Sequence, residues 1–300
     1  MSRRLTRYRK ALASFWALYR KNKFGMAGLI MFVFFAILAI LADAIAMAFG
    51  YTFGDLVFAV GSVATITPTE LFCAIAYGAR VSLVVGIAAS VCSVGIGTLI
   101  GMVSGFIGGK VDEVLMRITD FIMMLPGLPL LIVLAAVLRG GGSALGLGLI
   151  ILVIAILGWT GTARVVRSQV LSLKERPFVE AARAIGASDR YILFRHILPN
   201  VMPLVMTYMV LGVPGAILSE ASLTFLGLGV DPTRNISWGV ILYWAASVPI
   251  GGGGAGGALI YLTKPWVVVP PGLCITLLTL ATILMGYAMD EILNPRLRRR

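Results

Sequence analysis

The sequence has 300 residues, of which 59% are hydrophobic and 13% charged, and its mean hydropathy is +0.97. Soluble domains carry about a quarter charged residues, so this composition excludes an ordinary water-soluble domain. The formal net charge is +12, but the basic residues flank apolar segments, where they meet anionic lipid headgroups, and this excludes nucleic-acid binding as their purpose.

Residues 1–25 form a basic leader before the first apolar segment. Its apolar residues recur at intervals of three and four, which is typical of a helix with one apolar face: Leu5, Tyr8, Leu12, Phe15 and Tyr19. We expect a cytoplasmic amphipathic helix that lies in the membrane interface and orients the first span.

Six apolar stretches follow the leader. A bilayer core about 30 Å thick needs about 20 residues of helix, and a backbone in lipid must satisfy its own hydrogen bonds. The sequence therefore predicts an all-α polytopic membrane protein with about six transmembrane helices. The stretches are Met26–Phe49, Val81–Phe106, Phe121–Leu138, Ala144–Ala163, Val201–Ser219 and Trp266–Met289.

The predicted organisation follows from these spans. An anchor helix occupies 26–49, an external loop 50–80, a five-helix core 81–289 and a basic cytoplasmic tail 290–300. The core includes a cytoplasmic loop over 164–200 and an external loop over 220–265.

Orientation follows from the basic residues, which mark the cytoplasmic side of membrane proteins. They crowd the leader, the loop over 164–200 and the tail, and only Arg80, Arg139, Arg234 and Lys264 fall on the other side. The protein is therefore predicted to be a multi-pass protein of the cell membrane with both termini in the cytoplasm.

Glycine and proline mark the irregular points of the core. Small residues through the second stretch predict close packing at the centre of a bundle, and the glycines at its end predict a short turn from Lys110 to Arg117. A glycine run over 251–257 predicts a flexible external loop. Prolines predict kinks, which occur both in static bundles and along paths: Pro126, Pro129, Pro203 and Pro214.

The cytoplasmic loop has the sequence signals of two short helices. Pro177 suits a first helical turn, Gly186 suits the left-handed position after a helix, and Ser188 suits an N-cap. We expect Leu198 and Pro199 to end the second helix and return the chain to the membrane.

The loop residues permit two interpretations. Val179, Ala182 and Arg183 are predicted to share one side of the first helix, and exposed small and apolar side chains are typical of a docking surface. The alternative is an ordinary helical hairpin on the membrane surface. Glu180 likewise either contacts a partner or pairs locally with Arg183.

The order Glu180-Ala181-Ala182, Gly186 and Leu198-Pro199 resembles the signature loop of ABC importer permeases: EAA, three residues, G, nine residues, I, one residue, LP. His196 stands where the general pattern has isoleucine. Further motifs resemble the dipeptide, oligopeptide and nickel branch, and within it the second, C-type permease: YGARVSL over 77–83, GGKVDE over 108–113, RHILPN over 195–200, EASLTFLGLG over 220–229 and SWG over 237–239.

The resemblance implies a type I ABC importer permease-like bundle that supplies half of a path for di- or oligopeptides. It implies a second homologous permease chain, two cytoplasmic P-loop ATPase subunits that bind ATP and magnesium, and an extracytoplasmic substrate-binding protein. This chain has no phosphate-binding Gly-Lys-Ser/Thr loop, and we expect it to bind no cofactor itself. The ATPase-coupling residues that the resemblance implies are Glu180, Ala181, Ala182, Arg183, Gly186, Ala187, Leu198 and Pro199.

Glu220, Ser222 and Trp238 are candidates for the substrate path at the external side. The alternative for Glu220, which is costly to leave in lipid, is that it bonds backbone groups where the helix gives way to a loop. With a single histidine, scattered cysteines and no nucleophile–base pair, we expect neither a metal site nor a catalytic site.

Two other functions stay open. The same scaffold could import another solute, such as nickel, a glycoside or an opine, because this branch is reused. A channel-like or structural membrane subunit without an ATPase is the second, and the signature spacing argues against it.

Overall fold

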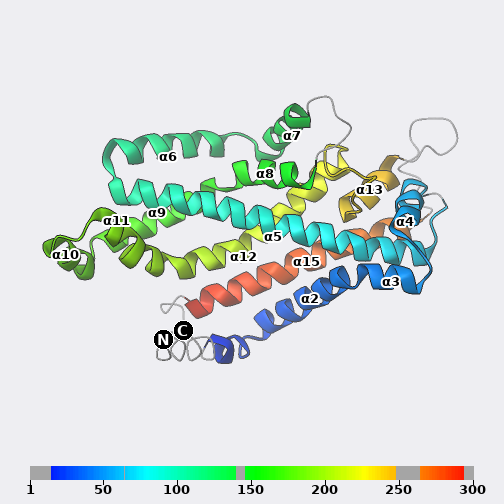
Figure 1. Ribbon diagram of the computed structural model, residues 1–300, viewed down its shortest axis with the longest axis horizontal. Helices are drawn as coiled ribbons and strands as arrows, with labels where there is room; N and C mark the ends of the chain where they lie inside the picture. The colour runs from blue at the N-terminus through cyan, green and yellow to red at the C-terminus, as the bar shows by residue number, and fades with distance from the viewer. Residues whose placement is uncertain (1–14, 64, 140–145, 248–263, 294–300) are drawn as a thin grey trace.

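The computed structural model describes residues 15–63, 65–139, 146–247 and 264–293, and among them it contains helices and turns but no β-strand (Figure 1). The predicted all-α fold is confirmed. The helices are α2 (Lys23–Ile40), α3 (Ala42–Ala48), α4 (Phe53–Gly61), α5 (Pro68–Ile107), α6 (Gly109–Met124), α7 (Gly127–Arg139), α8 (Leu147–Gly158), α9 (Thr160–Lys174), α10 (Pro177–Ala184), α11 (Asp189–Ile192), the π-helical turn η1 (Leu193–Ile197), α12 (Leu198–Phe225), α13 (Trp238–Ser247) and α15 (Pro265–Leu293).

Within these ranges, four helical runs are long and apolar enough to cross a bilayer: α2, α5, the run Asp189–Phe225 and α15. Three bent pairs raise the number to seven if each pair is one span. These are α3 with α4, α6 with α7, and α8 with α9, bent by 85°, 95° and 48°. Exposed apolar helices of this length are typical of a multi-pass membrane protein.

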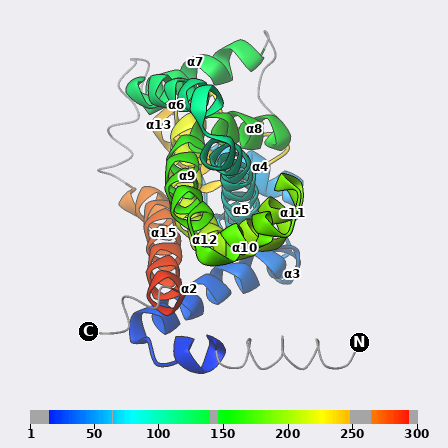
Figure 2. The same cartoon turned by 90° about the vertical axis from the view of Figure 1, so that its left-hand side faces the viewer.

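Helix α5 is the central element. It begins with Pro68 after a capping box between Thr67 and Glu70, and its 40 residues extend about 60 Å, more than a bilayer core requires. It packs against α2, α8, α9 and α12. The view from the end that carries α10 and α11 shows α5, α9 and α12 side by side, with α2 and α15 on one flank and α6 on the other (Figure 2).

Three glycines let α9 lie directly on α5, as the small residues of the second stretch predict. A Cβ atom on Gly97 would stand 2.5 Å from the backbone carbonyl oxygen of Trp159, the N-cap of α9. A Cβ atom on Gly101 would stand 2.5 Å, and one on Gly105 2.9 Å, from backbone carbonyl oxygens within α9. Because those obstacles are backbone atoms, no side-chain rotation relieves them. The helix axes can therefore approach this closely only with glycine at these positions.

The third predicted span, Phe121–Leu138, is not one straight helix. α6 and α7 meet at 95°, and Leu125, the first of the two residues between them, has an extended backbone with ψ of 140°. Pro126 is the cause, because its ring disfavours a helical conformation in the preceding residue.

Two predicted connections are helical in the structure. The expected turn from Lys110 to Arg117 is wrong, because these residues belong to α6. Gly108 and Gly109, with φ of 71° and 56°, reverse the chain in two residues, so no longer turn is needed. The segment 50–80, expected as a loop, contains α4 and the first turns of α5, each begun by a capping box.

The prediction that Leu198 and Pro199 end a helix is also wrong. Helix runs without a break from Asp189 to Phe225. Pro199 lacks an N–H group and its ring would clash with a carbonyl one turn earlier, and the π-helical turn Leu193–Ile197 widens the helix just before it. The side-chain amide of Asn200 also donates a hydrogen bond to the His196 carbonyl, 2.6 Å away.

The glycine run over 251–257, most of the leader and the end of the tail lie outside the described residues. The predictions made for them stay predictions.

Candidate functional site

The turn between α10 and α11 is built by Gly186. Its φ of +83° is the left-handed conformation, and two backbone hydrogen bonds close the helix end: Gly186 N–H to Arg183 O at 2.9 Å and Ala187 N–H to Ala182 O at 3.0 Å. This pair of bonds is a Schellman motif. The Ser188 hydroxyl then accepts the N–H of Tyr191 and begins α11. The helix–glycine–helix prediction for this loop is confirmed.

Burial divides the loop into an anchored side and an exposed side. Val179 and Ala182 of α10, with Ile192 and Ile197, pack into an apolar cluster with α5, α9 and α12. The side chains turned outward include large apolar ones: Phe178, Ile185, Tyr191 and Phe194, of which Ile185 is 85% exposed. Figure 2 shows α10 and α11 lying across this end of the bundle. The loop is thus a rigid platform with an apolar outer surface.

The charged residues of α10 lie on the exposed side. Arg183 does not share the buried side with Val179 and Ala182 as predicted. Its guanidinium lies 5.9 Å from the centre of the Phe106 ring, because the charged group stays at the surface while its stem covers apolar atoms. Among the described residues Glu180 forms no ion pair, so the local pair with Arg183 is absent.

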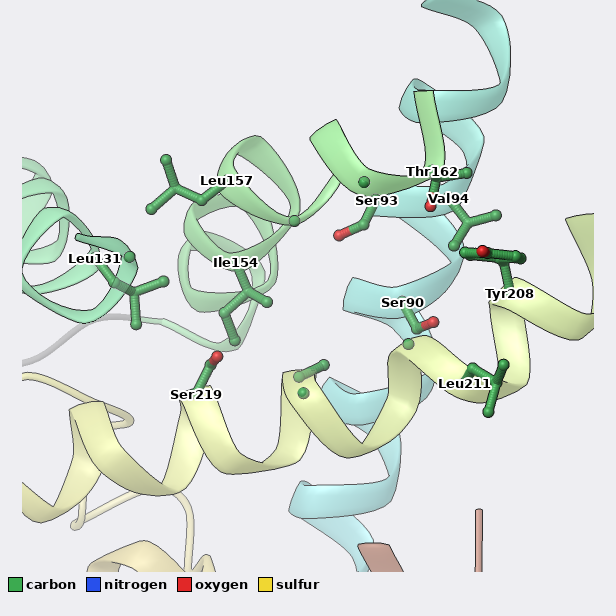
Figure 3. Close-up of a pocket in the computed structure, with 16 residues that line it drawn as sticks. Ser90, Ser93, Val94, Leu131, Ile154, Leu157, Thr162, Tyr208, Leu211 and Ser219 are labelled. Carbon is green, nitrogen blue, oxygen red and sulfur yellow. The ribbon is translucent and has the colours of Figure 1, made fainter. Parts of the chain in front are cut away.

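A cavity of about 440 Å³ opens in the bundle between α5, α7, α8, α9 and α12 (Figure 3). α12 lines it with Tyr208, Gly212, Gly215 and Ser219, and α5 with Ser90 and Ser93. The remaining walls come from α7, α8 and α9, including Leu131, Ile154, Leu157 and Thr162.

The cavity wall is apolar with scattered hydroxyl groups. None of the described lining residues is charged. The Ser90 hydroxyl donates to the Met209 carbonyl at 2.6 Å and so fastens α5 to α12 at the wall, whereas Ser93 and Ser219 point into the space (Figure 3). Such a surface can hold a polar molecule through hydroxyl groups without binding any one charge tightly.

The sequence did not single out these lining residues. A signal was present in α12, where Tyr208, Gly212, Gly215 and Ser219 recur at intervals of three and four, the spacing of one helix face. The prolines of the same stretch predict kinks and carry no information about this face.

The three external candidates lie elsewhere. Neither Glu220, Ser222 nor Trp238 lines the cavity. Glu220 and Trp238 are each 0% exposed. The Trp238 indole donates to the Ile75 carbonyl at 3.0 Å, and Glu220 accepts the Thr224 hydroxyl at 2.9 Å rather than backbone groups.

The motif over 77–83 also has a structural explanation. Tyr77 donates to one carboxylate oxygen of Asp43 at 2.6 Å, and Arg80 donates to the other at 2.9 Å. Arg80 additionally donates to the Ala39 carbonyl. The motif therefore ties α5 to the end of α2 and to α3.

Two family profiles match the chain. The binding-protein-dependent transport system inner membrane component matches residues 97–299, which is more than half of the sequence. The chain belongs to this permease family. The N-terminal TM domain of oligopeptide transport permease C matches residues 10–56, so the resemblance to the C-type permease is confirmed as well.

Similar proteins agree with this assignment. The permease is 35% identical over 294 residues to the oligopeptide transport system permease protein OppC of Bacillus subtilis (strain 168), covering 94% of this chain and 88% of OppC. It is 32% identical over 296 residues to the dipeptide transport system permease protein DppC of the same organism, covering 95% and 85%. It is 34% identical over 229 residues to the glutathione transport system permease protein GsiD of Pectobacterium atrosepticum, covering 76% and 70%.

Proposed function

We propose that this permease forms half of the translocation path of an ATP-driven importer and couples to a separate ATPase through residues 178–199. The observation that carries the proposal is the platform itself. Buried Val179 and Ile192 fix it to the bundle, while Glu180, Ile185 and Phe194 stay exposed. A membrane subunit with no use for a partner would gain nothing from this apolar surface outside the bilayer.

The platform is suited to mechanical coupling. Its second helix continues without interruption into α12, and α12 supplies one wall of the cavity. A push on α10 and α11 is therefore transmitted to the cavity wall through continuous helix, as a rigid-body movement between two states. No bond chemistry in this chain is required.

The proposed assembly contains a second permease chain, two cytoplasmic P-loop ATPases that bind ATP and magnesium, and an external substrate-binding protein. The platform then faces the cytoplasm. The beginning of α2 and the end of α15 lie toward the same end of the bundle as the platform, and α3, α4 and α13 lie toward the other (Figure 1). This arrangement supports cytoplasmic termini.

The proposed solute is a di- or oligopeptide. The similar proteins named for oligopeptide and dipeptide transport support it, and a cavity with hydroxyl groups and no charged wall suits a substrate whose side chains vary. A second candidate solute is glutathione, because the similar protein GsiD is named for glutathione transport.

The test is co-purification and uptake with the native partner subunits. We compare the wild type with Glu180→Arg and Gly186→Val, and we use Glu113→Arg as the matched control. Glu113 is an exposed glutamate of α6 whose ion pair with Arg117 is also exposed, so the control makes the same charge change away from the platform.

The proposal requires that a P-loop ATPase purifies with the wild type and the control, and that the platform variants lose it or lose ATP-driven peptide uptake. If no ATPase is held by any form, the permease works without one. If the wild type holds the ATPase but does not import peptides, the importer assignment stands and the solute is a different one.

A further inference from the structure

A buried polar cluster joins three elements at the outer end of the bundle. The carboxyl group of Glu220 on α12 faces the hydroxyl groups of Ser237, Thr224 and Ser82, and all four residues are at most 3% exposed. Ser82 belongs to α5, and Ser237 directly precedes α13, where its hydroxyl accepts the N–H of Val240. The carboxyl is thus the meeting point of α5, α12 and the start of α13.

The hydrogen bonds of this cluster are incomplete in one respect. One oxygen of Glu220 accepts the Thr224 hydroxyl, but within the described residues neither Oε2 of Glu220 nor Oγ of Ser82 has a hydrogen-bond partner. None of the described lysines and arginines pairs with the carboxyl. A buried negative charge without a cation is strongly unfavourable.

A neutral carboxylic acid resolves both points. Its carbonyl oxygen accepts from Thr224, and its O–H is a donor that Ser82 Oγ can accept. No charge then remains in the apolar interior. A bond from the carboxyl O–H to Ser82 Oγ, formed by a closer approach than the structure shows, would satisfy both unpartnered atoms. The groups that face the carboxyl from all three elements are hydroxyls, which suit this arrangement and provide no counter-charge.

The same region is packed too tightly for separate movement. Trp238, the first residue of α13, is wholly buried and lies against Gly78 of α5, where a Cβ atom would come within 2.5 Å of the indole. A Cβ on Gly239 would stand 2.9 Å from Thr224. Polar and apolar contacts therefore link the three elements in one block.

The block stands directly behind the cavity. Ser219 points into the cavity from α12 (Figure 3), and Glu220, the next residue, faces away from it toward α5 and Ser237. Any displacement of the block is consequently a displacement of the cavity wall.

We propose that Glu220 is a positioning residue that acts as a neutral acid and latches α12 to α5 and to the start of α13, so that these outer ends move as one body. It is not a charge on the substrate path. The latch concerns the permease whatever its solute, so it does not depend on peptide transport.

The test uses the assembled complex and two substitutions at one position. Glu220→Gln keeps a carbonyl for Thr224 and an N–H donor for Ser82, so we expect wild-type assembly, thermal stability and substrate-stimulated ATP hydrolysis. Glu220→Leu keeps neither, and we expect a lower melting temperature and loss of that stimulation. Leu218→Ala, at an exposed position of the same helix, is the control for changes in α12 that do not involve the latch.

Infrared spectroscopy of the complex supplies an independent readout. The C=O stretch of a protonated carboxylic acid should be present in the wild type, absent in Glu220→Gln and shifted in Ser82→Ala, which removes the accepting oxygen. A wild type without this band, a Glu220→Gln complex that fails to assemble or loses stimulation, or a Glu220→Leu complex that behaves as wild type would each overturn the latch.

Discussion

Arg167 of α9 binds Asp112 of α6 through two parallel hydrogen bonds, Nε to Oδ1 and Nη2 to Oδ2, each 2.5 Å long. The Ser104 hydroxyl of α5 donates to the same carboxylate. In α6 only Thr119 is a buried residue, so apolar packing contributes little to its position. Three helices are instead fixed at one carboxylate, which is only 15% exposed.

Replacing Asp112 with Ala should therefore loosen α6. The substitution leaves the Arg167 guanidinium without its partner, and we expect a loss of about 1–3 kcal/mol in the free energy of unfolding. Thermal unfolding in detergent measures this loss of stability. Arg117→Ala is the control, because it breaks an ion pair that is exposed on both sides and should cost at most about 1 kcal/mol. Equal effects of the two substitutions would contradict the role of the Asp112 carboxylate.

Gly101→Ala should destabilise the packing of α5 against α9. The added Cβ would stand 2.5 Å from the Ala163 carbonyl oxygen, so the helices must separate, at a cost of about 1–3 kcal/mol. Gly95→Ala on the same helix meets no atom within 4 Å and should stabilise it by about 0.5–1 kcal/mol through helix propensity. The melting temperatures should move in opposite directions, and a common direction would refute the close-packing argument.

The effect of a substitution at Gly186 should depend on how well the new residue adopts the left-handed backbone conformation, and not on its size. A Cβ there meets no atom within 4 Å, so the cost is that of a left-handed residue, about 1–2 kcal/mol for a β-branched side chain. We expect ATPase co-purification to fall in the order Gly, Asn, Ala, Val, because Asn tolerates this conformation best after Gly. A ranking by side-chain volume alone, with Asn worse than Ala, would show that the position is a packing site.

Gly215→Phe should block the cavity without unfolding the protein. Gly215 lines the cavity, and a Cβ on it meets no atom within 4 Å, so the ring can enter the open space. We expect loss of uptake with the free energy of unfolding within about 0.5 kcal/mol of wild type. Leu218→Phe on the exposed side of α12 is the control. Uptake that survives Gly215→Phe would mean that the solute takes another route.

Much of this protein follows from local sequence. The long apolar stretches determine membrane helices, because a backbone in lipid has no other way to satisfy its hydrogen bonds. Gly186 and Ser188 determine the turn between α10 and α11, because the hydrogen bonds of a helix end join residues within five positions of each other. These interactions are local, so a pattern in the sequence is enough to predict them.

Other features exist only once distant residues meet. Asp112 and Arg167 are 55 residues apart, and Trp238 and Ile75 are 163 apart. The cavity is lined by five helices, and Glu220 faces hydroxyl groups on α5 and just before α13. Tertiary packing decides these features, because the burial of each group depends on which helices become its neighbours.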